Sequence, residues 1–192
     1  MVMPSAFLII GAGLGGAFLL GFLRNEWRST AFGVTLLALG FMTLISADWV
    51  WSIGFKGAEP FDVLTAGIAP PFAINLRVAL PEAVLVLLVS LTGLLSAIYL
   101  KGSFTRLGRR SMAVLLIDVM ALCGIILTRD IFNMFVFFEL VVISTGGLIL
   151  LSEDQRALGA GFKYLIVSQV ISILLLLGII FTYHNYGTLN ID

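Results

Sequence analysis

Six apolar stretches of 18 to 25 residues, nearly free of charge, constrain this chain more than any other feature of its sequence. Crossing about 30 Å of hydrocarbon takes roughly 20 residues of helix. In lipid, a helix satisfies its own backbone N–H and C=O groups, whereas irregular backbone cannot. The sequence therefore predicts an all-α, polytopic membrane helix bundle of about six transmembrane helices. The stretches are Pro4–Leu23, Ser29–Ser52, Ala79–Leu100, Ser111–Thr128, Ile131–Leu151 and Leu158–Thr182.

Composition agrees with a membrane location and excludes several function classes. Apolar residues make up 60% of the chain and charged residues 11%, against about 45–50% and 25% in soluble domains. A net charge of +0 gives no reason to expect nucleic acid as a partner. One cysteine, Cys123, and one histidine, His184, cannot build a disulfide, a tetrahedral zinc site, an iron–sulfur cluster or a bis-histidine haem. We therefore expect no cofactor, no metal and no catalytic centre belonging to this chain.

The loops predict organisation and orientation. Residues 1–110 form a three-helix membrane segment whose extended loop, 53–78, is rich in proline and has room for a short hairpin. No basic region precedes the first apolar run, which indicates a retained helix rather than a cleaved signal. Loops after the first, third and fifth helices hold seven Lys and Arg, and loops on the other face hold three. This bias predicts a multi-pass protein of the cell membrane, with both termini outside and the Lys101–Arg110 loop in the cytoplasm, near anionic lipid.

Ionisable residues inside the helices are the candidates for function. A charge at the bilayer centre costs at least ~2.5–3.5 kcal/mol, so it needs an explanation. Glu139 lies nine residues after Asp130, roughly 14 Å along its helix, among apolar neighbours. A carboxyl there suits proton exchange. The alternative is a structural carboxyl that stays protonated and hydrogen-bonded to a neighbouring helix.

Other polar positions have competing explanations. Lys163 could face a proton path or extend to the lipid headgroups. Asp118 could extend a path or pair with a nearby arginine. Asp130 suits the start of a helix, where the macrodipole favours an acidic side chain, and Glu82, near an interface, could simply be solvated. A polar stripe follows Lys163 and could hold water or contact another helix; it comprises Tyr164, Ser168 and Ser172, with Gln169 beside them.

A glycine motif near the N-terminus has two interpretations. Gly11–Gly16 fits G-x-G-x-x-G, the dinucleotide fingerprint. That motif binds a pyrophosphate only between a strand and a helix, and here it lies within an apolar run. Close helix packing by small residues, including Gly11 and Gly15 at G-x-x-x-G spacing, is the better interpretation.

The stretch Thr128–Leu140, TRDIFNMFVFFEL, resembles the fifth helix of the antiporter-like membrane subunits shared by Mrp-type cation/proton antiporters, complex I and membrane-bound hydrogenases. Residues Gly161–Leu165 and Tyr183–Asn190 resemble the family's sixth helix and the turn after it, and Ala69–Ile74 the loop before its third helix. The pieces are most similar to the D subunit of Mrp antiporters.

The resemblance implies roles and partners. Glu139 would be the glutamate of the proton path, Lys163 the family's sixth-helix lysine, and residues 111–192 the first part of an antiporter-like repeat. Asp118 departs from the family, which has an apolar residue there. The sequence stops before the family's broken seventh helix and its partner lysine, so we expect a split subunit, a fragment or a relict. Other membrane subunits, one supplying the missing C-terminal half, would then be partners, together with lipids, protons and sodium as a candidate coupled cation.

Three hypotheses follow. The first is an ion-translocating subunit in which Glu139, with Lys163 and water, moves protons coupled to sodium or to a redox module. The second is a scaffold that fills a place in a membrane complex without conducting. The third, an electron-carrying or quinone-reducing subunit, is weakest because ligands for haem and clusters are missing.

Overall fold

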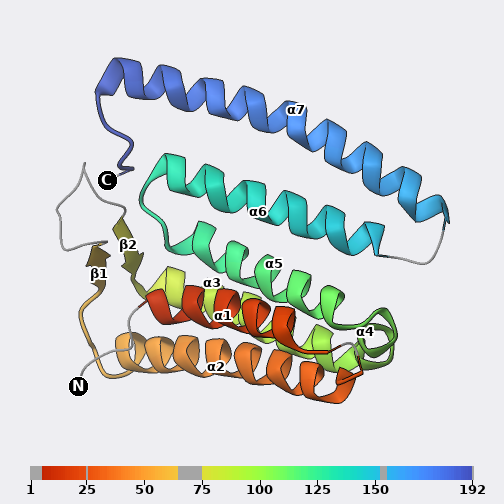
Figure 1. Ribbon diagram of the computed structural model, residues 1–192. Helices are drawn as coiled ribbons and strands as arrows, with labels where there is room; N and C mark the ends of the chain where they lie inside the picture. Colours follow the sequence, from red (N-terminus) through yellow and green to blue (C-terminus); the bar gives the residue numbers. More distant parts are fainter. Residues whose placement is uncertain (1–5, 25, 65–74, 152–154, 192) are drawn as a thin grey trace.

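The computed structural model describes residues 6–24, 26–64, 75–151 and 155–191. These residues form seven helices and one two-stranded sheet (Figure 1). The helices are α1 (Phe7–Phe22), α2 (Arg28–Gly54), α3 (Leu80–Tyr99), α4 (Lys101–Leu107), α5 (Arg109–Leu127), α6 (Ile131–Leu150) and α7 (Gln155–Tyr186), and the strands are β1 (Phe61–Leu64) and β2 (Asn75–Val78).

Each predicted apolar stretch forms one helix, which confirms the polytopic membrane bundle. Five helices in the described part are long and apolar enough to cross a membrane, and α1 is a shorter apolar helix of 16 residues. The sequence missed α4, because its charged residues are typical of a loop. The buried ring of Phe104 anchors this short helix, which ends at Leu107 and is followed by Gly108, where φ is +86°.

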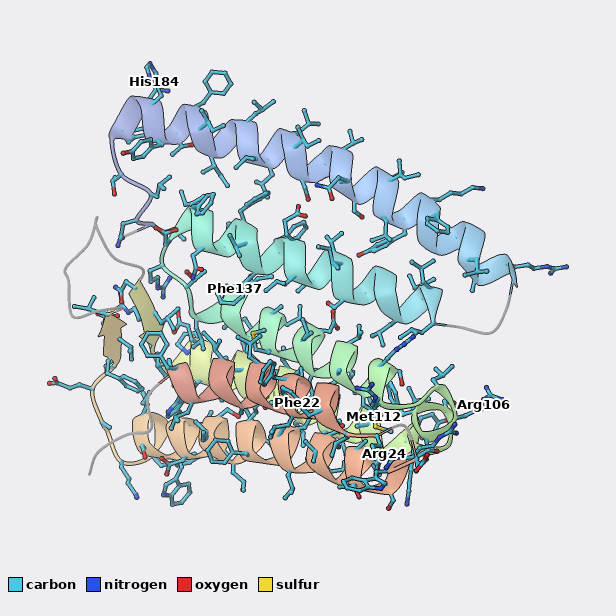
Figure 2. The ribbon with its side chains drawn as sticks, viewed as in Figure 1. Phe22, Arg24, Arg106, Met112, Phe137 and His184 are labelled. Carbon is cyan, nitrogen blue, oxygen red and sulfur yellow. The ribbon has the colours of Figure 1, made fainter. Side chains whose placement is uncertain are left out.

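Helix α5 is the centre of the bundle. It contacts α1, α2, α3, α4 and α6, and buries Met112, Leu116 and Met120. The other face of α6 supports α7, which forms the outer layer (Figure 1). Small residues allow the close packing that membrane helices need. A Cβ added at Gly124 would meet the ring of Phe137, which points from α6 toward α5 in Figure 2.

The glycine motif lies wholly inside α1, so the strand-to-helix turn that a dinucleotide site requires is absent from this described segment. Packing is confirmed, but the residues differ from the prediction. A Cβ at Gly13 or Gly16 would collide with α5, whereas Gly11 and Gly15 have no neighbour within 4 Å. The wrong pair was predicted because the spacing of a motif does not show which helix face is covered.

The predicted hairpin forms at the end of the bundle where α1 begins and α7 ends (Figure 1). Strands β1 and β2 pair antiparallel, with Phe61 opposite Val78. The resemblance at 69–74 lies outside the described residues. The sheet edge continues to the α5–α6 turn through a bridge between Leu76 and Thr128. Backbone bonds from Arg129 N–H to the Asn75 carbonyl and from Ile191 N–H to the Arg129 carbonyl, both 2.9 Å, extend the connection to the segment after α7.

Basic residues gather at the opposite end of the bundle. Figure 2 shows Arg24 and Arg106 near α4, at the end where α1 and α3 finish and α5 begins. The strands and the hairpin lie at the other end. The six apolar helices thus alternate in direction as the loop pattern requires, and the assignment of the α4 end to the cytoplasm stays a prediction. The division of the chain at residue 110 also stays a prediction.

Candidate functional site

Asp118, on α5, lies against two hydroxyl groups of α6. Ser144 Oγ donates a hydrogen bond of 2.7 Å to Asp118 Oδ1, and Thr145 Oγ1 donates one of 3.1 Å to the same oxygen. Ser144 is buried, and its Oγ also lies 2.6 Å from the Leu140 carbonyl. A hydroxyl can donate in either direction by rotation. The arrangement joins a carboxyl on α5 to the backbone carbonyl of Leu140, the residue directly after Glu139 on α6.

The Asp118 carboxyl also lines a cavity of about 320 Å³ between α3 and α5. Thr92 and Ser96 contribute hydroxyl-bearing side chains to the wall, and apolar residues form the rest. A space of this size with several polar groups can hold water molecules. The structure therefore gives Asp118 a side that bonds to α6 and a side that faces a mostly apolar recess with two hydroxyl-bearing residues, rather than the arginine partner considered from the sequence.

The register of α6 against α7 follows from two close contacts. A Cβ at Gly146 would collide with Leu165, and a Cβ at Gly161 would collide with Leu150. The helices are antiparallel neighbours (Figure 1), so each step forward along α6 is one step backward along α7. This register places Glu139 level with Ser172.

Glu139 and Ser172 share a second property. Glu139 Oε1 and Ser172 Oγ are both buried, and neither has a hydrogen-bond partner among the described residues. A buried polar atom without a partner costs about 1–3 kcal/mol, so two at one level make this level of α6 and α7 a candidate site. A bridging water would give each atom a partner. Asp118 and Glu139 are thus the two carboxyls that α5, α6 and α7 hold inside the membrane in the described part.

The polar stripe faces α6. Ser172 is fully buried, Tyr164 and Ser168 are half-buried, and Gln169 is exposed beside them. Extending the register places Ser168 near the level of Ser144, so the stripe runs from the Asp118 level to the Glu139 level. Hydroxyl groups therefore follow the buried seam between the two helices.

Lys163 does not approach Glu139. The register puts it level with Leu148, nine residues along α6 from Glu139, or roughly 14 Å along the axis. Its side chain is exposed on α7. In the described part of the chain, no ion pair is formed by Glu139. The structure therefore separates the two residues that the resemblance joins in one path.

Asp130 caps α6. Its Oδ1 accepts a hydrogen bond of 2.7 Å from Asn133 N–H, and the Asn133 amide donates one of 2.9 Å to Thr128 Oγ1. An N-cap carboxylate satisfies a free donor and complements the helix dipole. Asp130 therefore holds the helix that carries Glu139, at the hairpin end and away from the buried seam.

An ion pair at the same end was missed by sequence reasoning. Arg129 Nη2 donates to Glu82 Oε1 at 2.5 Å, and the two side chains are 23% and 13% exposed. Glu82 Oε2 also accepts from Ala79 N–H at 3.1 Å, closing the first turn of α3. Glu82 is thus paired, and the expectation that solvation alone accounts for it was wrong. The two residues lie 47 positions apart, and no sequence spacing could have joined them.

The structure also places two hydroxyl residues of α6 and the histidine of the chain. The hydroxyls of Ser144 and Thr145 were not singled out from the sequence, although adjacent hydroxyl residues in an otherwise apolar helix are a detectable signal. His184 points away from the bundle beyond α7 in Figure 2, so the chain's histidine takes no part in this site.

Residues 128–192 match the family model described as NADH:quinone oxidoreductase/Mrp antiporter, TM. The matched segment contains α6 and α7 and therefore Glu139 and the polar stripe. The D subunit of the Na(+)/H(+) antiporter of Bacillus subtilis is 30% identical over 179 residues, covering 92% of this chain and 36% of that protein. An uncharacterized protein of Methanocaldococcus jannaschii is 38% identical over 106 residues, covering 55% of this chain and 22% of that protein.

A solved structure has the same fold. The match is a chain of the membrane-bound sulfane sulfur reductase, an archaeal respiratory membrane complex, with a TM-score of 0.86 and 26% identity. It covers 96% of this chain and 38% of that chain. The present chain therefore spans between about a fifth and two fifths of the length of these relatives.

Proposed function

Because this multi-pass membrane chain is homologous to subunits of Mrp antiporters and of related respiratory complexes, we propose that it is a membrane subunit of a multisubunit cation/proton antiporter or a related respiratory complex. In that complex it takes part in proton translocation through Glu139. Protons are the transported species, and sodium is a candidate for the coupled cation. The buried, unpartnered Oε1 of Glu139, level with the unpartnered Oγ of Ser172, is the observation that carries this proposal.

The geometry supports a site where a proton can be held and released. Glu139 lies about eight residues into a 20-residue helix, among apolar side chains. Its charged form is costly there unless water or a cation stabilises it. A water between Glu139 and Ser172 would accept a proton from the carboxyl and pass it along the hydroxyl groups of α6 and α7.

Asp118 supplies a second carboxyl on the same seam. Ser144 lies five residues beyond Glu139 on α6 and donates directly to Asp118. The recess that Asp118 shares with Thr92 and Ser96 offers a place for water on the α3 side. We therefore place Asp118, Ser144 and Glu139 in one path across α5 and α6, with the Ser168 and Ser172 hydroxyls along its border.

Lys163 acts, in this proposal, together with another chain. It is exposed on α7, and only 11% of the apolar 18-residue stretch of that helix is buried inside the structure. A membrane subunit packed against α7 would cover both Lys163 and Gln169. Transport then requires that partner, and the purified polypeptide alone should move no protons.

A non-conducting scaffold is the second candidate function, and the separation of Lys163 from Glu139 favours it. Glu139→Gln distinguishes the two, because Gln keeps the size and a hydrogen-bond donor but cannot titrate. The assay is cation/proton exchange or redox-driven proton movement in vesicles that contain the whole complex. We expect normal assembly and at least a tenfold loss of ion movement, since a positioned proton-transfer group contributes roughly 10²–10⁴-fold.

Glu59→Gln is the matched control, because Glu59 is exposed in the loop after α2. Ser172→Ala tests the bridging site and should slow ion movement while leaving assembly intact. Wild-type rates in an assembled Glu139→Gln complex would establish the scaffold instead.

A further inference from the structure

Two polar side-chain atoms at the hairpin end of the bundle are buried and have no hydrogen-bond partner among the described residues. They are Asn75 Oδ1, at the start of β2, and Arg129 Nε, in the turn between α5 and α6. Asn75 is only 7% exposed, so solvent does not supply the missing bond to its oxygen. A buried polar atom that stays unpaired destabilises the fold, and each of these atoms therefore needs a partner.

The backbone places these two residues beside each other. Leu76 and Thr128 form an antiparallel bridge, and one residue further along in the same register Asn75 stands opposite Arg129. The bond of 2.9 Å from the Arg129 N–H to the Asn75 carbonyl agrees with this register. Residues opposite each other in an antiparallel pair have Cβ atoms about 4.5–5.5 Å apart. The two side chains therefore start from neighbouring positions in one junction.

The tip of the Arg129 side chain is already fixed. Its Nη2 donates to Glu82 in the first turn of α3, and the other carboxylate oxygen of Glu82 accepts from the N–H of Ala79, the residue directly after β2. The arginine stem therefore runs from its start opposite Asn75 toward the other end of β2. Because Nε precedes the tip of the side chain, it lies between these two points, on the way from Asn75 to Glu82.

The chemistry of the two atoms selects the ligand. The Nε–H group of Arg129 can only donate, and the carboxamide oxygen of Asn75 can only accept. A ligand that satisfies both must accept one hydrogen bond and donate another. An anion would compete with Glu82 for the guanidinium, and a cation would be repelled by the guanidinium. Water is neutral, donates and accepts, and typically makes about three such bonds when it is buried in a protein.

We propose that Arg129 and Asn75 form a binding site for one ordered water molecule, which accepts from Arg129 Nε–H and donates to Asn75 Oδ1. The water joins β2 to the α5–α6 turn through side chains, next to the backbone bond that already joins them. It also holds the guanidinium in the direction of Glu82, so the ion pair and the hairpin support each other. The site uses no residue of the Glu139 seam and is independent of proton translocation.

Nuclear magnetic resonance of the full, isotopically labelled chain in detergent micelles tests the site. The Nε–H signal of Arg129 is the arginine signal that Arg129→Lys removes. In a rotating-frame experiment, a cross-peak from this proton to water with the sign opposite to the diagonal reports a bound water molecule beside it. A cross-peak with the same sign reports exchange with bulk solvent. We expect the opposite sign for Arg129 in the unchanged chain, a result that depends on no variant at Asn75.

Two variants test the part played by Asn75. Asn75→Leu nearly keeps the shape of the side chain and removes the acceptor. The water cross-peak should then disappear, and the Nε–H proton of Arg129 should exchange about tenfold faster, the factor that one ordinary hydrogen bond contributes. Asn185→Leu is the matched control, because it makes the same change at an exposed position near the end of α7. It should leave the cross-peak and the exchange rate unchanged.

The result can contradict the water site in two ways. A cross-peak with the same sign as the diagonal, or no cross-peak, for Arg129 in the unchanged chain would overturn the proposal and favour a direct bond between the two side chains. A folded Asn75→Leu chain that keeps the full cross-peak would show that the water does not use Asn75, and the proposed bridge would be wrong.

Discussion

The Glu82–Arg129 ion pair should measurably stabilise the membrane fold, and a double-mutant cycle tests this. The substitutions are Glu82→Gln, Arg129→Met and both together. Gln retains an oxygen that can accept from Ala79 N–H, so the first turn of α3 keeps its cap. Met keeps the length of the arginine stem and the backbone bonds of residue 129. The cycle therefore isolates the interaction between the two charges.

The expected size follows from burial. A hydrogen bond to a charged group contributes about 1.5–3 kcal/mol, and breaking a fully buried pair costs about 3–5 kcal/mol. Glu82 and Arg129 are 13% and 23% exposed, so the pair lies between these cases. We expect each single variant to lose about 2–3 kcal/mol of unfolding free energy. The double variant should lose less than the sum of the two, by about 1.5–2 kcal/mol.

Unfolding by sodium dodecyl sulfate in mixed micelles, followed by far-ultraviolet circular dichroism, gives the free energies. Glu59→Gln, at an exposed position, should change stability by no more than about 0.5 kcal/mol. A coupling energy for Glu82 and Arg129 below about 0.5 kcal/mol would refute the reasoning, because it would show that the pair behaves as an exposed one.

Two other predictions follow from the packing, and a third follows from the basic residues of the loops. Asp118→Ala should lower the unfolding free energy by about 2 kcal/mol through two lost hydrogen bonds, whereas Asp118→Asn, which still accepts, should cost less than about 1 kcal/mol in the same assay. Gly124→Val should lower the unfolding free energy by about 1–3 kcal/mol, because the added side chain would collide with the ring of Phe137. Gly33→Val is the control, since Gly33 faces open space, and it should lower the unfolding free energy by less in the same titration. In a cysteine-free background, a cysteine at Gly102 should react with an impermeant maleimide only from the cytoplasm, and one at Glu59 only from outside; labelling of both from one face would contradict the predicted topology.

The sequence predicted the helices well because lipid imposes one rule on every segment. Length and apolarity suffice to identify a membrane helix, and even the proline-rich loop was correctly expected to have room for a hairpin. The α4 helix escaped notice because its stability comes from burying Phe104 against other helices, which no local pattern records.

The sequence singled out candidate residues but not their arrangement. Glu139 could be singled out because a charge in an apolar helix is conspicuous. The arrangement around Glu139 depends on the register of neighbouring helices. That register places Glu139 level with Ser172 and far from Lys163, and it brings Asp118 to its hydroxyl partners. Close contacts at glycines set that register, and the sequence does not show which side chain each glycine contacts in the packed bundle. The same limit explains why the wrong pair in the glycine motif was expected to pack.

The backbone bridges at the hairpin end have a kinetic consequence. They join β2, the α5–α6 turn and residues 189–191, segments that a ribosome makes at widely separated times. Helices enter a membrane in order, so the bonds between the α5–α6 turn and residues 189–191 cannot form until α7 has crossed, although β2 can join the turn earlier. Closing such long loops slows a folding step. A newly inserted chain therefore passes through a period in which α6, with Glu139, is in the bilayer but its hairpin end is not yet bonded to the segment after α7. During that interval the seam beside α6 is open to any helix able to compete with α7.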